Sequence, residues 1–110
     1  MTVGLSCRGE AREYGVPVGT GPAVELSALL PDVESHLDER VLIEARILEV
    51  CPTAGCWFVL EDGGEQLHVT LSTFTLPRAV EGERCRVAGT LVLREERPTL
   101  LATGLDILAD

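Results

Sequence analysis

Two cysteines five positions apart have the residue type and spacing best suited to chemistry in this chain. Cys51 and Cys56 flank the four residues Pro-Thr-Ala-Gly, and Trp57 follows directly. A loop of this length between two strands would place the cysteines opposite each other, where Cα atoms lie about 4.5 Å apart and a disulfide fits. A bridge across so short a loop stabilises a fold by only about 2 kcal/mol, so redox or metal chemistry is also open.

Three states of the cysteine pair fit the sequence: a disulfide, a soft-metal site and free thiols. Thiolates favour Cu(I) or Zn(II), and His68 on the neighbouring predicted strand could add an imidazole. Zinc usually takes four ligands, and the candidates for the fourth are Cys7, His36 and Cys85. Cys85 alternates with apolar residues, which predicts a buried thiol, whereas His68 should face solvent. The sequence establishes no cofactor, and the metals that these residues could hold are Cu and Zn.

The sequence contains no recognised catalytic constellation. The familiar redox motif has two residues between its cysteines and begins a helix, whereas this pair has four and lies on a predicted hairpin. All nine basic residues are arginine, which excludes a Schiff-base lysine, a P-loop lysine and a lysine general base. Glu61 and Asp62 lie at a turn, as ordinary solvated carboxylates do. We therefore expect a protein that is not an enzyme.

The charge balance weighs against nucleic acid as a partner. The net charge is −9, and binding to nucleic acid depends on arginine and lysine near the phosphates. Arg84 and Arg86 alternate outward and leave a small basic stripe, with Trp57 and Phe74 as candidate stacking residues. Packing of Trp57 against the core is the competing interpretation. The partner is not identifiable, although the acidic surface would suit a basic protein.

Five predicted strands must position these residues. Alternation of apolar and polar residues predicts strands over 41–50, 56–61, 65–71, 84–93 and 99–108. Breaks in the alternation predict a bulge at Leu48 and another near Gly104. Ser27 is the expected N-cap of a short helix over 28–36, and 72–80 is expected to form a short helix or loop.

The order of these elements predicts an all-β fold with little helix. Three meandering strands, a connector and two more strands are typical of a five-stranded OB-type barrel, here with a short N-terminal helix. Another small barrel or a short sandwich is the second choice. A length of 110 residues indicates one domain over 24–110, preceded by an irregular arm over 1–23 that is rich in Gly and Pro.

The sequence also leads to expectations about membrane spans, compartment and assembly state. No apolar run approaches the roughly 18–20 residues that span a bilayer. Residues 1–15 lack the basic and apolar regions of a signal peptide, which predicts a reduced cytoplasmic protein, or an exported one if a leader was removed. We expect a monomer or a small homo-oligomer.

The region from about 24 to 93 resembles a family of small bacterial OB-fold proteins of unknown function. The family signature is Val-Cys, a three-residue spacer, Gly-Cys-Trp and an apolar strand that ends in Asp-Gly. Here it is matched by Val50-Cys51, Gly55-Cys56-Trp57 and Asp62-Gly63, and further along by Val69-Thr70, Phe74, Pro77, Gly82 and Gly89. The spacer is often basic in the family and is Pro-Thr-Ala here. The resemblance implies the barrel and the cysteine hairpin, and no reaction, because the family has no agreed activity.

Two hypotheses about function follow from the sequence. The leading one is a non-enzymatic binding or accessory module in which the Cys51/Cys56 hairpin is a disulfide clasp or a soft-metal site. The alternative is an OB module that binds an oligonucleotide or a protein, in which the two cysteines only brace the loop.

Overall fold

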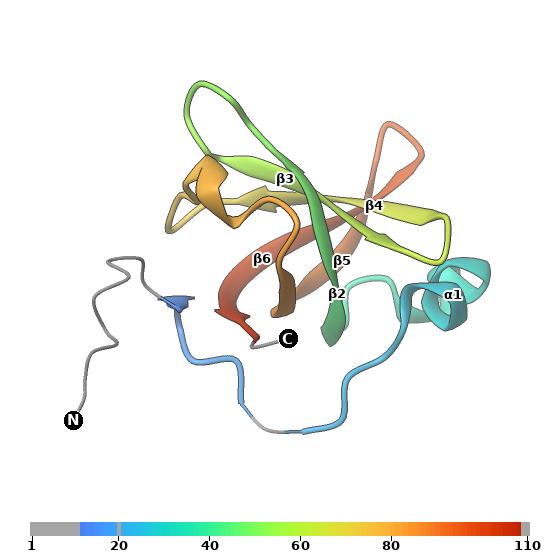
Figure 1. Ribbon diagram of the computed structural model, residues 1–110. Helices are drawn as coiled ribbons and strands as arrows, with labels where there is room; N and C mark the ends of the chain where they lie inside the picture. Colours follow the sequence, from blue (N-terminus) through green and yellow to red (C-terminus); the bar gives the residue numbers. More distant parts are fainter. Residues whose placement is uncertain (1–11, 20, 109–110) are drawn as a thin grey trace.

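The computed structural model describes residues 12–19 and 21–108, which form a small closed β-barrel (Figure 1). Its elements are β1 (Glu13–Gly15), α1 (Leu26–Leu29), η2 (Leu30–His36), β2 (Arg40–Val50), β3 (Trp57–Asp62), β4 (Glu65–Leu71), η3 (Arg78–Val80), β5 (Arg84–Arg94) and β6 (Arg97–Ile107). The sheet order is β1-β6-β4-β3-β2-β5, and pairing of β5 with β6 closes the barrel. The predicted OB-type fold is therefore confirmed.

The connection after β4 gives the barrel its closure. β4 pairs with β6 in parallel, whereas the other strand pairs are antiparallel. Parallel neighbours need a crossover, and the chain makes it through η3 and β5. The connector predicted over 72–80 thus contains a single short 3₁₀ turn at its end.

Two bulges bend the long strands where the sequence predicts them. The β2–β3 register shifts between Ile47 and Glu49, and the extra residue Leu48 is 47% exposed. The β5–β6 register shifts where Ala88 and Gly89 face Gly104 and Ala102. Bulges increase local twist, which a barrel of long strands needs in order to close.

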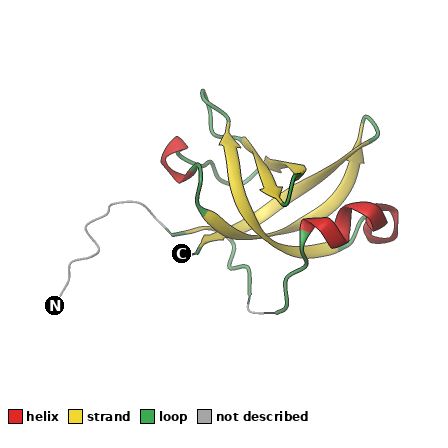
Figure 2. Ribbon diagram, turned by 45° about the vertical axis from the view of Figure 1, so that its right-hand side comes forward, coloured by secondary structure: helices red, strands yellow, loops and turns green. Residues whose placement is uncertain are grey.

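The core is almost wholly aliphatic, as an aromatic content of 4% requires. Phe58 at its centre is fully buried, and Leu60, Leu67 and Val69 pack on the same inner face. Figure 2 shows α1 and η2 beside one end of the barrel. Leu26 and Leu29 of α1 are buried there, so the helix covers apolar surface that the open barrel end would expose.

The N-terminal helix differs from the prediction. Ser27 lies inside α1 instead of capping it, because Glu25 is the N-cap and Leu26 must enter the first turn to be buried with Leu29. Pro31 then stops the α-helix, since it lacks the N–H that would bond back to the previous turn. The chain continues as a 3₁₀ helix with a non-helical Asp32. No helix of the described residues is long and apolar enough to cross a membrane.

The segment predicted as irregular contains a strand. Glu13 and Gly15 of β1 pair with Asp106 and Gly104 of β6 (Figure 1). Gly104 is needed for this pairing, because a Cβ there would lie 1.8 Å from the Val16 carbonyl oxygen. Cys7, whose role the sequence left open, lies outside the described residues.

Gly89 provides a test of the barrel closure. A Cβ at this position would lie 2.3 Å from the Leu101 carbonyl oxygen and 2.8 Å from the Ala102 Cα, both backbone atoms of β6. Gly89→Ala should therefore lower the free energy of unfolding by about 1–3 kcal/mol, measured by urea denaturation. Gly21→Ala is the matched control, since no atom lies within 4 Å of its Cβ position. Equal stabilities of the two variants would contradict the close packing of β5 on β6.

Candidate functional site

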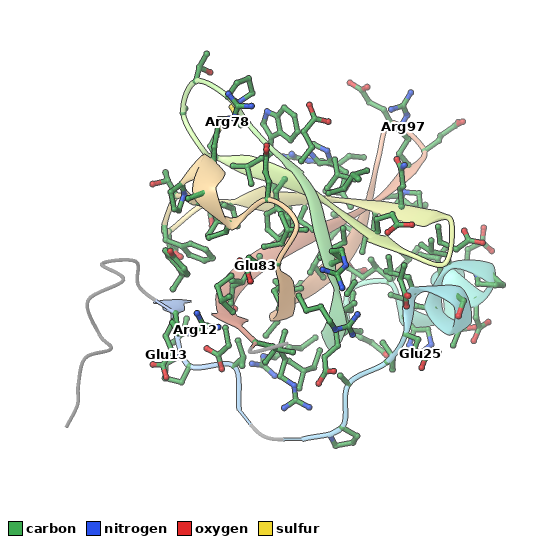
Figure 3. All side chains as sticks on the ribbon, viewed as in Figure 1. Arg12, Glu13, Glu25, Arg78, Glu83 and Arg97 are labelled. Carbon is green, nitrogen blue, oxygen red and sulfur yellow. The ribbon has the colours of Figure 1, made fainter. Side chains whose placement is uncertain are left out.

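A groove runs along the outer face of β3 and β4, beside the β5–β6 hairpin. Its volume is about 820 Å³. It is lined by Val59, Gln66, His68, Arg94, Glu95, Arg97, Pro98 and Thr99. Figure 3 shows Arg97 near the tip of the hairpin that forms one wall. This groove brings together residues from four strands, β3 to β6, and one turn.

His68, which lines the groove, belongs to an aromatic pair. The rings of Trp57 and His68 stack with centroids 5.6 Å apart and an interplanar angle of 29°. His68 lies opposite Val59 in the β3–β4 register, so Trp57 is its diagonal neighbour on the outer face. Trp57 is half-buried and lies outside the core cluster, which favours the stacking interpretation over core packing. His68 is exposed, as predicted.

The surroundings of His68 favour the neutral form of its imidazole. Its pKa is lowered from the usual value by partial burial, and the nearby charges of Arg94 and Arg97 lower it further. A neutral imidazole stacked on an indole presents a flat surface with little charge. The positive charge of this region therefore lies on the two arginines.

Arg94 and Arg97 face each other at the end of the β5–β6 hairpin. They form the last register pair before the turn, and neither makes an ion pair with any described residue. The turn residues Glu95 and Glu96 both have positive φ, at 53° and 68°, a conformation that glycine or asparagine usually occupies. The two arginines thus flank two glutamates in a strained backbone conformation, and strained backbone of this kind is frequent at functional sites.

The other predicted ligand residues lie elsewhere. The guanidinium of Arg86 pairs with Glu44 at 3.0 Å and donates to the Gly21 carbonyl at 2.9 Å, so it ties the N-terminal segment to the barrel. Phe74 stacks on Tyr14 with ring centroids 6.0 Å apart. Arg84 shares β5 with Arg86, and none of these side chains lines the groove. The sequence pattern indicated Arg84 and Arg86 as ligand residues and did not indicate Arg94 and Arg97. Two arginines on either side of a two-residue turn would have been a usable signal of a binding site.

The cysteine loop has a different register from the one expected. The Cys51 N–H donates to the Trp57 carbonyl at 3.0 Å, and Val50 pairs with Phe58. Cys51 therefore lies opposite Trp57, and the expectation that it directly faces Cys56 is wrong by one residue. A shift of one residue places side chains on opposite faces of a hairpin. The two thiols also differ in exposure, because Cys51 is buried and Cys56 is exposed, and both are free.

The loop folds around the sulfur of Cys51. The Ala54 N–H donates to Sγ at 3.5 Å, and the Thr53 hydroxyl lies 3.5 Å from the same atom. These donors lower the pKa of Cys51 to about 6, with the Thr53 hydroxyl contributing most and burial opposing the shift. Cys85 behaves oppositely, because complete burial raises its pKa to about 12, and its predicted place in the core is confirmed.

The residues considered for a metal site are not brought together. The described part of the chain contains no group of three or more His, Cys, Asp or Glu side chains that could hold a metal ion. His68 stacks on Trp57, while Cys51 is enclosed by its own loop and Cys56 faces solvent. The combination of Cys51, Cys56 and His68 is therefore not assembled as one ligand set.

Comparisons with known proteins bear on the fold. No family model and no curated protein matches the chain. A provisionally assigned aspartyl-tRNA synthetase from Leishmania major is similar, with a TM-score of 0.61 and 16% identity over 88% of this chain and 23% of that one. The hypothetical protein ygiW from E. coli is similar, with a TM-score of 0.57 and 12% identity over 86% and 99% of the two chains. Both likenesses show a shared small barrel, and the family resemblance of the cysteine hairpin stays a prediction.

The Cys51 environment predicts a pH dependence. Because its folded pKa of about 6 lies below the ordinary value of 9.0, the unfolded chain binds this proton more tightly. The contribution of Cys51 to stability should therefore grow as pH rises from about 6 toward 9, and be lost as pH falls through about 6. Thr53→Val should raise this pKa, followed by the carbon NMR shift of the Cys51 Cβ. An unchanged titration would contradict the role of the hydroxyl, and Thr73→Val is the control.

Proposed function

We propose that this protein is a non-enzymatic OB-type module that binds a single-stranded oligonucleotide in the groove beside the β5–β6 hairpin. The observation that carries the proposal is that His68, which stacks on Trp57, lines the groove together with two arginines that have no carboxylate ion-pair partner among the described residues. Aromatic rings can stack on bases, and guanidinium groups can bind phosphates.

The place of the groove in the fold supports the same ligand. OB-folds bind oligonucleotides over their second and third strands, between the loops that join strands 1–2 and 4–5. Here these strands are β3 and β4, and the loops are 51–56 and the β5–β6 turn. The similarity to part of the Leishmania major protein described as an aspartyl-tRNA synthetase is compatible with this proposal. At 16% identity, that similarity concerns the fold alone.

The acidic charge of the chain limits how the ligand is bound. A net charge of −9 opposes a long phosphate track, and the described residues that line the groove include two cationic groups, Arg94 and Arg97, and one carboxylate, Glu95. We therefore infer a short site, in which stacking supplies much of the affinity and about two phosphates are contacted. Two phosphate contacts on a single strand correspond to a slope of about −1.4 in log K against log salt.

Binding can be measured by fluorescence anisotropy of labelled oligothymidylate and oligouridylate. Trp57→Ala should weaken binding by about 5- to 150-fold, the range expected for loss of one base-stacking contact. The double variant Arg94→Gln, Arg97→Gln should weaken binding and bring the salt slope close to zero. The matched control is Arg40→Gln, Arg84→Gln, which removes the same charge outside the groove.

Two results would contradict the proposed function. One is the absence of saturable binding to any single-stranded oligonucleotide at low salt. The other is an equal loss of affinity in the control double variant, which would show that net charge, not the groove, determines binding. Saturable binding of a basic peptide at the groove, without oligonucleotide binding, would instead identify a protein ligand.

A further inference from the structure

The geometry points to a second site, the 51–56 loop, as a dithiol that a low-molecular-weight disulfide such as glutathione disulfide oxidises to an intramolecular Cys51–Cys56 disulfide. The exposed Cys56 would react first, and the buried Cys51 would resolve the mixed disulfide. This inference does not depend on oligonucleotide binding.

The two cysteines are close enough for a bridge although they point apart. Cys51 lies opposite Trp57, and Cys56 directly precedes Trp57 in the chain. The Cα atoms of the two cysteines are therefore offset by one residue across the hairpin. Strand geometry gives such a pair a separation of roughly 6 Å. This lies within the range for disulfides, and only the side-chain directions are unsuitable. A rotation of the loop backbone, without any change in the barrel, would correct them.

The contacts of the loop show which part can move. The Gly55 carbonyl accepts from the Leu76 N–H at 3.0 Å, and the Cys56 carbonyl accepts from the Leu71 N–H at 2.9 Å. Gly55 has a φ of +66°, and the Leu76 carbonyl oxygen lies 2.3 Å from the place where a Cβ would be. The Cys56 end is therefore anchored. In contrast, Pro52, Thr53 and Ala54 are exposed, so this part of the loop can turn once the contacts of Thr53 and Ala54 with the Cys51 sulfur are released.

The exposure of the two thiols sets the order of the steps. Cys56 loses its proton to solvent, and its sulfur attacks one sulfur of glutathione disulfide, which breaks the S–S bond and releases one glutathione thiolate. Cys51 then attacks the Cys56 sulfur and releases the second glutathione. Two protein thiols are oxidised, and one glutathione disulfide is reduced to two glutathione molecules.

The polar loop prepares Cys51 for the second step. The Thr53 hydroxyl and the Ala54 N–H stabilise its thiolate, and its lowered pKa makes the thiolate available at neutral pH. Glutathione disulfide is too bulky to reach Cys51 directly, because that residue is only 7% exposed. Cys85 cannot compete, since it is fully buried in the core.

The test uses the full chain with Cys7→Ser, so that the cysteine outside the described residues does not react. After incubation with glutathione disulfide at pH 7, intact mass spectrometry should show a loss of two hydrogen atoms, and peptide mapping should place the bond between Cys51 and Cys56. Cys51→Ser in this background should accumulate a mixed disulfide on Cys56. Cys56→Ser should react at least about tenfold more slowly, because Cys51 is shielded.

Controls separate this result from unfolding and from metal binding. Cys85→Ser should oxidise as the parent does, and near-ultraviolet circular dichroism should show each variant folded. The fluorescence of Trp57, the single tryptophan, should change on oxidation and return with reductant. A stable mixed disulfide on Cys56 in the parent, with no internal bridge, would overturn the inference. A bound copper or zinc ion that blocks oxidation would also overturn it.

Discussion

The register between β2 and β3 is the constraint on which both candidate sites depend. The bulge at Leu48 shifts this pairing so that Val50 meets Phe58, and Phe58 becomes the centre of the core. Because side chains alternate along a strand, burying Phe58 forces Trp57 to the outer face. The same register places Cys51 beside Trp57 and directs Cys56 away. A slip of one residue would exchange the inner and outer residues of β3.

The groove results from combining this outer face with an unfavourable turn. Trp57 and His68 are diagonal neighbours on β3 and β4, and the β5–β6 hairpin adds Arg94 and Arg97 beside them. The positive φ angles of Glu95 and Glu96 form a two-residue turn that suits the twist of the hairpin, but glycine or asparagine would adopt them more easily than glutamate. Two arginines beside one lining carboxylate, Glu95, suit a short anionic ligand, since the net charge of −9 would repel a longer one.

Alternation and turn chemistry were sufficient to predict the barrel, because each strand has one buried face. Every predicted strand is present within two residues, and the bulges near Leu48 and Gly104 occur as expected. The start of the helix was missed because burial of Leu26 outweighs the capping preference of Ser27. Pairing of Glu13–Gly15 with β6 was missed because a three-residue strand has no periodicity to detect.

The site was harder to predict, because it depends on contacts between distant segments. Arg86 is engaged by Glu44 and the N-terminal segment, whereas Arg94 and Arg97 have no carboxylate partner among the described residues, and alternation cannot distinguish these cases. The most direct test of the central claim is backbone and side-chain NMR of the intact protein titrated with a short single-stranded oligonucleotide. The account predicts that shifts concentrate at the Trp57 indole, the His68 imidazole, and the Arg94 and Arg97 amides. Shifts centred on Arg86 and Phe74, or none at all, would contradict it.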